Sequence, residues 1–247
     1  MSQDLTGLTY DDFRRRARNQ AISENEKIGF PDSYRAGSEG AIFADILGKL
    51  CALDGTRRTI IDIGCGCGPL AKLLIAHCAA REHRLILVDS AEMLENLAHE
   101  GAFEARPQRF PHDTAFLEEF SGAADAVLLY SVIQHEFTSG DLWGLFDAVC
   151  ALLAGNGRAL LGDIPNRSMR TRLFQSENGR AFHRSFTGSD DAPPIPPYGL
   201  IPKEIDDSVI MALLSRARAQ GIHGFVLPQA EGLPFYNRRE DILLFHP

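Results

Sequence analysis

The chain has 247 residues, of which 45% are hydrophobic, and a formal net charge of −8 at pH 7. This apolar content is enough to build a full core, which argues against a disordered chain, and the acidic balance argues against general binding to nucleic acids or membranes. Five cysteines at irregular spacings and no apolar run of membrane-spanning length lead us to expect a cytoplasmic protein with reduced thiols.

The most informative segment is a strand followed by a glycine-rich turn and a helix. The apolar run Ile60–Ile63 contains Asp62, glycines follow at positions 64, 66 and 68, and a helical pattern covers Leu70–Ala80. Because glycine has no Cβ, a ligand can lie against the main chain of such a turn. The arrangement predicts a pocket for an adenosyl group at the carboxyl edge of a parallel sheet.

Spacing separates two classes of adenosyl ligand. The dinucleotide fingerprint G-x-G-x-x-G requires a third glycine where this chain has Pro69. The observed pattern is D-x-G-x-G-x-G, formed by Asp62, Gly64, Gly66 and Gly68, and it resembles the first motif of class I S-adenosylmethionine-dependent methyltransferases. An ordinary turn between a strand and a helix is the alternative. Cys65 and Cys67 lack a second nearby Cys or His pair, so we expect no metal site.

The resemblance implies an α/β fold with a doubly wound, mostly parallel seven-stranded sheet. Its implied strand order is 3-2-1-4-5-7-6, with strand 7 antiparallel. Motifs support the resemblance over residues 40–165, and only the pattern of elements supports it over residues 203–247. We expect one domain with four parts: a helical cap (1–50), a cofactor-binding core (51–164), a substrate-side insertion (165–202), and a closing helix and hairpin (203–247).

The second strand, Arg84–Asp89, ends in an acid whose two oxygens match the vicinal diol of a ribose. Capping of the next helix, Ala91–Glu100, is an alternative role for Asp89. A third edge strand is expected over Gln108–Asp113. The resemblance implies that Asp113 receives the adenine amino group, whereas a cap for the helix Ala115–Phe120 is the alternative.

The fourth strand covers Ala124–Ser131. By the resemblance, Tyr130 and Ser131 lie beside the methionine part of the cofactor, and His135 and Glu136 lie at the rim where an acceptor enters. We predict a catalytic role for these two, with His135 as the first candidate for a general base because its ordinary pKa is near neutral. A structural or exposed histidine is the alternative.

A helix over Leu142–Leu153 leads to the fifth strand, Arg158–Ile164, where Asp163 is a further candidate proton acceptor. The helix Asp207–Gln220 and the strands His223–Leu227 and Asp241–His246 are expected to close the sheet.

Two regions outside this core are expected to determine acceptor specificity. In many small-molecule methyltransferases an amino-terminal segment covers the cofactor, and the resemblance implies that Tyr34 and Arg35 face the cofactor carboxylate. An arginine fork can pair with a carboxylate at two points. A solvated turn is the alternative.

Residues 165–190 contain five arginines against Glu177 and Asp190, a balance of 5 − 2 = +3 in an acidic chain. This segment favours an anionic acceptor, and a solvated helix face is the alternative. The predicted substrate-binding residues are Arg167, Arg170, Arg172, His183, Arg184 and Tyr198.

The sequence therefore predicts a methyltransferase that uses S-adenosyl-L-methionine and releases S-adenosyl-L-homocysteine. The expected acceptor is a small anionic metabolite, such as a sugar, phosphorylated or nucleotide-linked intermediate, methylated at oxygen. The alternatives are an NAD(P)-dependent oxidoreductase and a non-catalytic partner subunit that binds the same cofactor. Nucleic acid and membrane partners are not expected.

Overall fold

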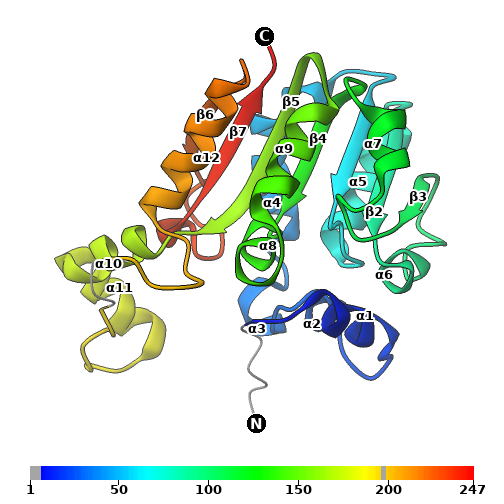
Figure 1. Cartoon of the computed structure of the whole chain (residues 1–247). Helices are drawn as coiled ribbons and strands as arrows, with labels where there is room; N and C mark the ends of the chain where they lie inside the picture. Colours follow the sequence, from blue (N-terminus) through cyan, green and yellow to red (C-terminus); the bar gives the residue numbers. More distant parts are fainter. Residues whose placement is uncertain (1–6, 196–198) are drawn as a thin grey trace.

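A computed structural model describes residues 7–195 and 199–247 of the chain. Its centre is a seven-stranded sheet with the order β3-β2-β1-β4-β5-β7-β6 (Figure 1). Strands β1 to β5 are parallel, and β7 is antiparallel to both β5 and β6. The predicted strand order and the antiparallel seventh strand are confirmed.

The central strands β1, β2, β4 and β5 follow from apolar runs that are buried on both faces, as expected for parallel strands covered by helices, whereas the edge strands β3 and β6 are only partly buried. The seven strands are β1 (Thr59–Ile63), β2 (Arg84–Asp89), β3 (Glu104–Pro107), β4 (Ala124–Tyr130), β5 (Leu153–Pro165), β6 (His223–Pro228) and β7 (Arg239–Phe245). Successive residues point to opposite faces, so Ile60 and Ile61 belong to two different hydrophobic clusters.

Helices cover both faces of the sheet (Figure 1). One cluster of buried side chains joins the sheet to α7 (Thr114–Phe120), α9 (Leu142–Leu152) and α12 (Asp207–Ala219). The other joins it to α4 (Glu39–Lys49), α5 (Pro69–Ala80) and α6 (Ala91–Glu95), with the short helix η1 (Cys51–Asp54) beside them. The product is a three-layer α/β fold.

A cap of three short helices lies at the carboxyl edge of the parallel strands, at the bottom of Figure 1. They are α1 (Tyr10–Arg18), α2 (Glu24–Lys27) and α3 (Asp32–Arg35), and α8 (Ile133–Ser139) follows β4 at the same edge. Polar contacts fasten the cap to the segment after β2. Arg14 donates to the carboxylate of Glu92 at 2.9 Å, and the ammonium group of Lys27 donates to Asn96 at 2.8 Å.

Three predicted elements differ from the structure, and one of them, the fifth strand, begins at Leu153 and not at Arg158. The third strand was expected over 108–113, but β3 ends at Pro107, and the residues after it form a turn around Pro111. A proline has no N–H to donate to a neighbouring strand, so a strand that contained Pro111 would lose one of the hydrogen bonds of the sheet. The helix expected over Ala91–Glu100 ends at Glu95, and the side chain of Asn96 donates to the carbonyl oxygens of Glu92 and Ala17.

The insertion after β5 folds as two helices, α10 (Arg167–Gln175) and α11 (Glu177–Thr187). They lie beyond the carboxyl end of β5, at the lower left of Figure 1, next to the short helix η2 (Tyr236–Arg238) that precedes β7. The insertion therefore extends the same edge of the sheet that carries the cap.

Helix α5 offers a matched test of the burial that holds the layers together. Leu74 is 1% exposed and its neighbour Leu73 is 37% exposed on the same helix. We expect Leu74→Ala to lower the free energy of unfolding by about 2–5 kcal/mol, because the loss of buried apolar contacts is accompanied by a cavity. Leu73→Ala should cost less than about 1 kcal/mol. Urea unfolding of both variants measures the difference, and equal losses would contradict the assignment of the buried face.

Candidate functional site

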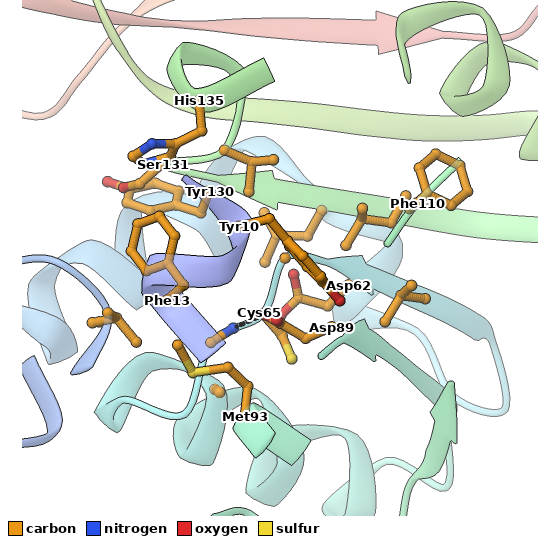
Figure 2. Close-up of a pocket in the computed structure, with 18 of the residues that line it drawn as sticks. Tyr10, Phe13, Asp62, Cys65, Asp89, Met93, Phe110, Tyr130, Ser131 and His135 are labelled. Atoms are coloured by element: carbon orange, nitrogen blue, oxygen red, sulfur yellow. Dashed lines mark hydrogen bonds between the residues drawn. The ribbon is translucent and has the colours of Figure 1, made fainter. Parts of the chain in front are cut away.

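The main cleft of the structure lies at the carboxyl ends of β1, β2 and β4, under the cap (Figure 2). In the strand order, β1 and β4 are the neighbours from which the chain winds in opposite directions. Open α/β sheets bind ligands at this point because the loops after the two strands diverge and leave a crevice. The topology therefore makes this cleft the candidate binding site.

The glycine turn after β1 forms the floor of the cleft. Gly64 and Gly66 have φ angles of 70° and 63°, which side chains with a Cβ rarely adopt. A Cβ on Gly64 would lie 2.6 Å from the side chain of Val132, and one on Gly66 would lie 2.7 Å from Ile28. A Cβ on Gly68 would also lie 2.7 Å from Ile28. The turn thus requires glycine for its backbone and for the close approach of the cap.

Two carboxyl groups face the cleft from adjacent strands (Figure 2). Asp89 accepts hydrogen bonds from the N–H of Gly66 at 2.8 Å and of Ser90 at 2.6 Å, one on each oxygen. Each oxygen keeps a further lone pair for a ligand. Burial raises the pKa of Asp89 to about 6, despite these hydrogen bonds. Burial, together with the nearby charge of Asp89, raises the pKa of Asp62 to about 8.

A buried guanidinium closes one end of the cleft. Arg35 lies over the ring of Phe30 at 4.7 Å and near that of Tyr130 at 5.5 Å. The Nε of Arg35 is buried and has no hydrogen-bond partner among the described residues. A buried donor without a partner is costly, so this side chain is suited to an anionic group of a ligand.

The ends of β4 and β5 are tied together by a short polar network. Ser131 and Asp163 both have left-handed backbone conformations, with φ angles of 63° and 61°. The hydroxyl of Ser131 donates to the carboxylate of Asp163, and Arg239 donates to the same carboxylate. This network fixes Ser131 in the main cleft.

His135 and Glu136 line the cleft from α8. The imidazole of His135 packs edge-on against Phe13 of the cap at 4.9 Å (Figure 2). Burial lowers the pKa of His135 below its usual 6.5, so the ring is neutral at pH 7 and can accept a proton. The carboxylate of Glu136 accepts a hydrogen bond from Arg109 at 3.2 Å, which makes it the less available of the two.

The structure brings ten predicted site residues to this one cleft. They are Arg35, Asp62, Gly64, Gly66, Gly68, Asp89, Tyr130, Ser131, His135 and Glu136. Tyr34 and Asp113 lie elsewhere. Tyr34 is 47% exposed and lines a second, smaller cleft with Phe235, which contacts its ring at 5.4 Å. Asp113 is exposed and caps α7 by accepting from the N–H of Ala115 at 3.0 Å, the alternative role stated above.

The predicted substrate residues of the insertion do not converge on the main cleft. Arg167 is buried and pairs with Asp206 at 3.1 Å, and Arg172 pairs with Asp207 at 2.5 Å. These two arginines anchor the insertion to the start of α12. His183 packs against the ring of Phe174, Arg170 and Arg184 are exposed, and Tyr198 lies outside the described residues.

Sequence reasoning missed the apolar and aromatic lining that the cap contributes. Tyr10, Phe13 and Ile28 come from α1 and the end of α2, while Met93 and Phe110 come from the segments after β2 and β3. Aromatic residues in a short helix carry no motif. The only usable signal was the pattern Thr9-x-x-Asp12, a capping box that marks the start of α1.

Within the described residues, no group of three or more His, Cys, Asp or Glu side chains is placed to hold a metal ion, and all five cysteines are free. Over the same residues, no helix is both long and apolar enough to cross a membrane.

Searches against protein-family models and curated proteins find no match to the chain. Solved structures do match. The N-methyltransferase NodS from Bradyrhizobium japonicum, in complex with S-adenosyl-L-homocysteine, is 13% identical with a TM-score of 0.56, over 96% of this chain and 98% of that chain. A SAM-dependent methyltransferase from Aquifex aeolicus is 12% identical with a TM-score of 0.56, over 92% of this chain and 100% of that one.

A third match is a Rhodobacter sphaeroides protein named provisionally as a Zn-dependent alcohol dehydrogenase. It is 17% identical with a TM-score of 0.52, over 87% of this chain and 91% of that chain. At such identities the likeness shows the fold alone, and the chemistry has to be argued from the residues of the cleft.

The raised pKa of Asp62 makes stability depend on pH. Since the folded-state value is about 8 and the ordinary value is 3.8, the stability that this group contributes at low pH is lost as pH rises through about 8. The free energy of unfolding of Asp62→Asn minus that of wild type should therefore be larger at about pH 9 than at about pH 5, by more than about 1 kcal/mol. Urea unfolding of the ligand-free proteins across this range is the measurement. A difference that stays constant with pH would contradict the buried, cation-free setting of this carboxyl.

Proposed function

We propose that this chain, whose fold is that of the class I S-adenosylmethionine-dependent methyltransferases, binds S-adenosyl-L-methionine in the main cleft and transfers its methyl group to a small molecule. One observation carries the proposal. The glycine turn at Gly64 and Gly66 follows Asp62 and is hydrogen-bonded to the carboxylate of Asp89, and all four residues line the cleft at the crevice between β1 and β4. This is a cradle for a nucleoside with a positively charged tail.

The residues present fit that group. The free lone pairs of Asp89 suit the two ribose hydroxyls, and the cleft lined by Asp89, Met93 and Phe110 suits the adenosyl group. Arg35, with its unpartnered Nε, suits the carboxylate of the methionine part. Asp62 complements its ammonium and sulfonium charges, and the ionised form of Asp62 is in turn favoured by a bound cation.

A dinucleotide fits less well. Its pyrophosphate would need N–H donors at the start of α5, but Pro69 at that position has none. Two acids at the floor of the cleft would also repel the phosphates. The oxidoreductase alternative is therefore disfavoured on the residues of the cleft.

The chemistry needs little from the protein beyond alignment. S-adenosyl-L-methionine supplies an electrophilic methyl group on its sulfonium. The cap and the aromatic lining exclude water and hold the acceptor in line with the methyl carbon, which raises the effective concentration. We propose that the neutral imidazole of His135 takes the proton of an acceptor hydroxyl, with Glu136 and Asp163 as further acceptors near the rim.

For the acceptor itself, we propose a small anionic metabolite methylated at oxygen, such as a sugar, phosphorylated or nucleotide-linked intermediate. The second, much smaller cleft, lined by Asp163, Phe235 and Tyr34, shares Arg35 and Tyr130 with the main one and lies beyond the ends of β4 and β5, on the side from which we propose that the acceptor approaches.

Ligand-induced stabilisation tests the cofactor. S-adenosyl-L-homocysteine should raise the melting midpoint and NAD should not, because only a ligand of the native state stabilises by mass action. In calorimetry, Asp89→Asn should weaken S-adenosyl-L-homocysteine binding about tenfold or more, by loss of charge-assisted hydrogen bonds. Asp113→Asn, the matched control, should leave it unchanged. Stabilisation by NAD alone would favour the oxidoreductase.

Removal of the imidazole tests the proposed base. With an acceptor from a methyl-transfer screen, His135→Asn should lower kcat about 10²–10⁴-fold and leave the affinity for S-adenosyl-L-homocysteine unchanged. The wild-type rate should fall with decreasing pH at an apparent pKa below 6.5, because the imidazole must be neutral. Formation of S-adenosyl-L-homocysteine is the readout. A variant as fast as wild type would remove His135 from the chemistry, and cofactor binding without turnover of any acceptor would favour the partner-subunit alternative.

A further inference from the structure

Arg238, at the end of η2, is surrounded by aromatic rings. Its guanidinium lies 4.5 Å from the ring centre of Phe235, 5.8 Å from that of Phe182 and 6.0 Å from that of Phe174. Phe174 and Phe182 belong to the two helices of the insertion. Three rings from three elements thus hold one cation at the junction of the insertion with the sheet.

This cation lacks an acidic partner. Across residues 7–195 and 199–247, neither Arg238 nor Arg170 forms an ion pair, whereas Arg167, Arg172 and Arg239 each pair with a carboxylate. The polar side-chain contact of Arg238 is the amide oxygen of Asn237 at 3.2 Å. No acidic side chain of the described residues therefore compensates its charge.

Like charges surround it as well. Burial and the neighbouring charges of Arg170 and Arg239 lower the pKa of Arg238 to about 10. Arg170 itself lies over the same Phe174 ring, at 5.8 Å. Two uncompensated guanidinium groups on one aromatic platform repel each other, and an anion bound between them would relieve that repulsion.

The platform continues into the second cleft. Phe235, under Arg238, lines that cleft together with Tyr34 and Asp163. Arg239, the next residue along the chain, lies over the same Phe235 ring at 5.1 Å and donates to Asp163. An anion on Arg238 is thus connected through one ring to the space at the ends of β4 and β5.

We propose that Arg238, assisted by Arg170, binds a phosphoryl group of a molecule that lies along the insertion beside the second cleft. Two guanidinium forks match the charge and the several oxygens of a phosphate monoester better than a single carboxylate. The inference deepens the proposed function, on which it rests: the methyl acceptor is a phosphorylated small molecule, held by its phosphate at the insertion while its hydroxyl reaches the main cleft.

The test is a calorimetric titration of the full chain with inorganic phosphate at constant ionic strength. Arg238→Gln should weaken phosphate binding about tenfold or more, and Arg170→Gln should weaken it less. Arg238→Lys should keep part of the affinity, because it keeps the charge and loses the fork. Arg57→Gln is the matched control, since it removes an exposed guanidinium before β1, and it should bind phosphate as wild type does.

Absence of phosphate binding to wild type, or equal losses in Arg57→Gln and Arg238→Gln, would overturn the inference. Affinity for S-adenosyl-L-homocysteine is measured on the same samples and separates the two proposals. Phosphate binding that depends on Arg238 would stand even if the cofactor did not bind, and normal cofactor binding would stand if phosphate binding failed. Unchanged melting midpoints of Arg238→Lys and Arg57→Gln show that the comparison is made between folded proteins.

Discussion

The rest of the site depends on the burial of Asp62 beside Asp89 at the ends of two parallel strands. Charge on one carboxyl disfavours charge on the other, and burial disfavours both, so the ligand-free cleft holds acids whose pKa values are raised to about 8 and about 6. The ionised forms of such a pair are favoured by a cation bound beside them. The proposed cofactor carries such a charge on its methionine part.

The floor and the roof of the cleft constrain each other. Ile28 of the cap lies so close to Gly66 and Gly68 that neither position has room for a Cβ. The cap is in turn held by Arg14 on Glu92 and Lys27 on Asn96, both in the segment after β2. The glycines therefore serve the backbone of the turn and also the fit of the cap over it, and the aromatic wall of the cleft is fixed by contacts made outside it.

The sequence predicted the parts of the fold and site that local pattern determines. Asp62 lies in β1 just before the glycine turn that contains Gly66, and Asp89 is the last residue of β2. Because the ends of these strands meet at one edge of the sheet, the strand pattern is enough to predict that the three residues lie in one site. Asp113 and the arginines of the insertion do not, because the role of a charged side chain depends on its partner. Arg167 forms an ion pair with Asp206, which is 39 residues away in the chain, whereas Arg238 has no acidic partner among the described residues. No spacing rule distinguishes the two.

The ends of β4 and β5 show how the two clefts are connected. Ser131 and Asp163 each adopt a left-handed backbone conformation, which costs on the order of 1 kcal/mol or more. Such a conformation persists only where contacts with the surrounding structure hold it in place. The turn directs Ser131 into the main cleft and Asp163 into the second, and their side chains bond to each other. Arg239 completes this chain of contacts beside Arg238. Because Asp163 lines the second cleft and bonds to Ser131 in the main one, it is a direct contact between the two clefts.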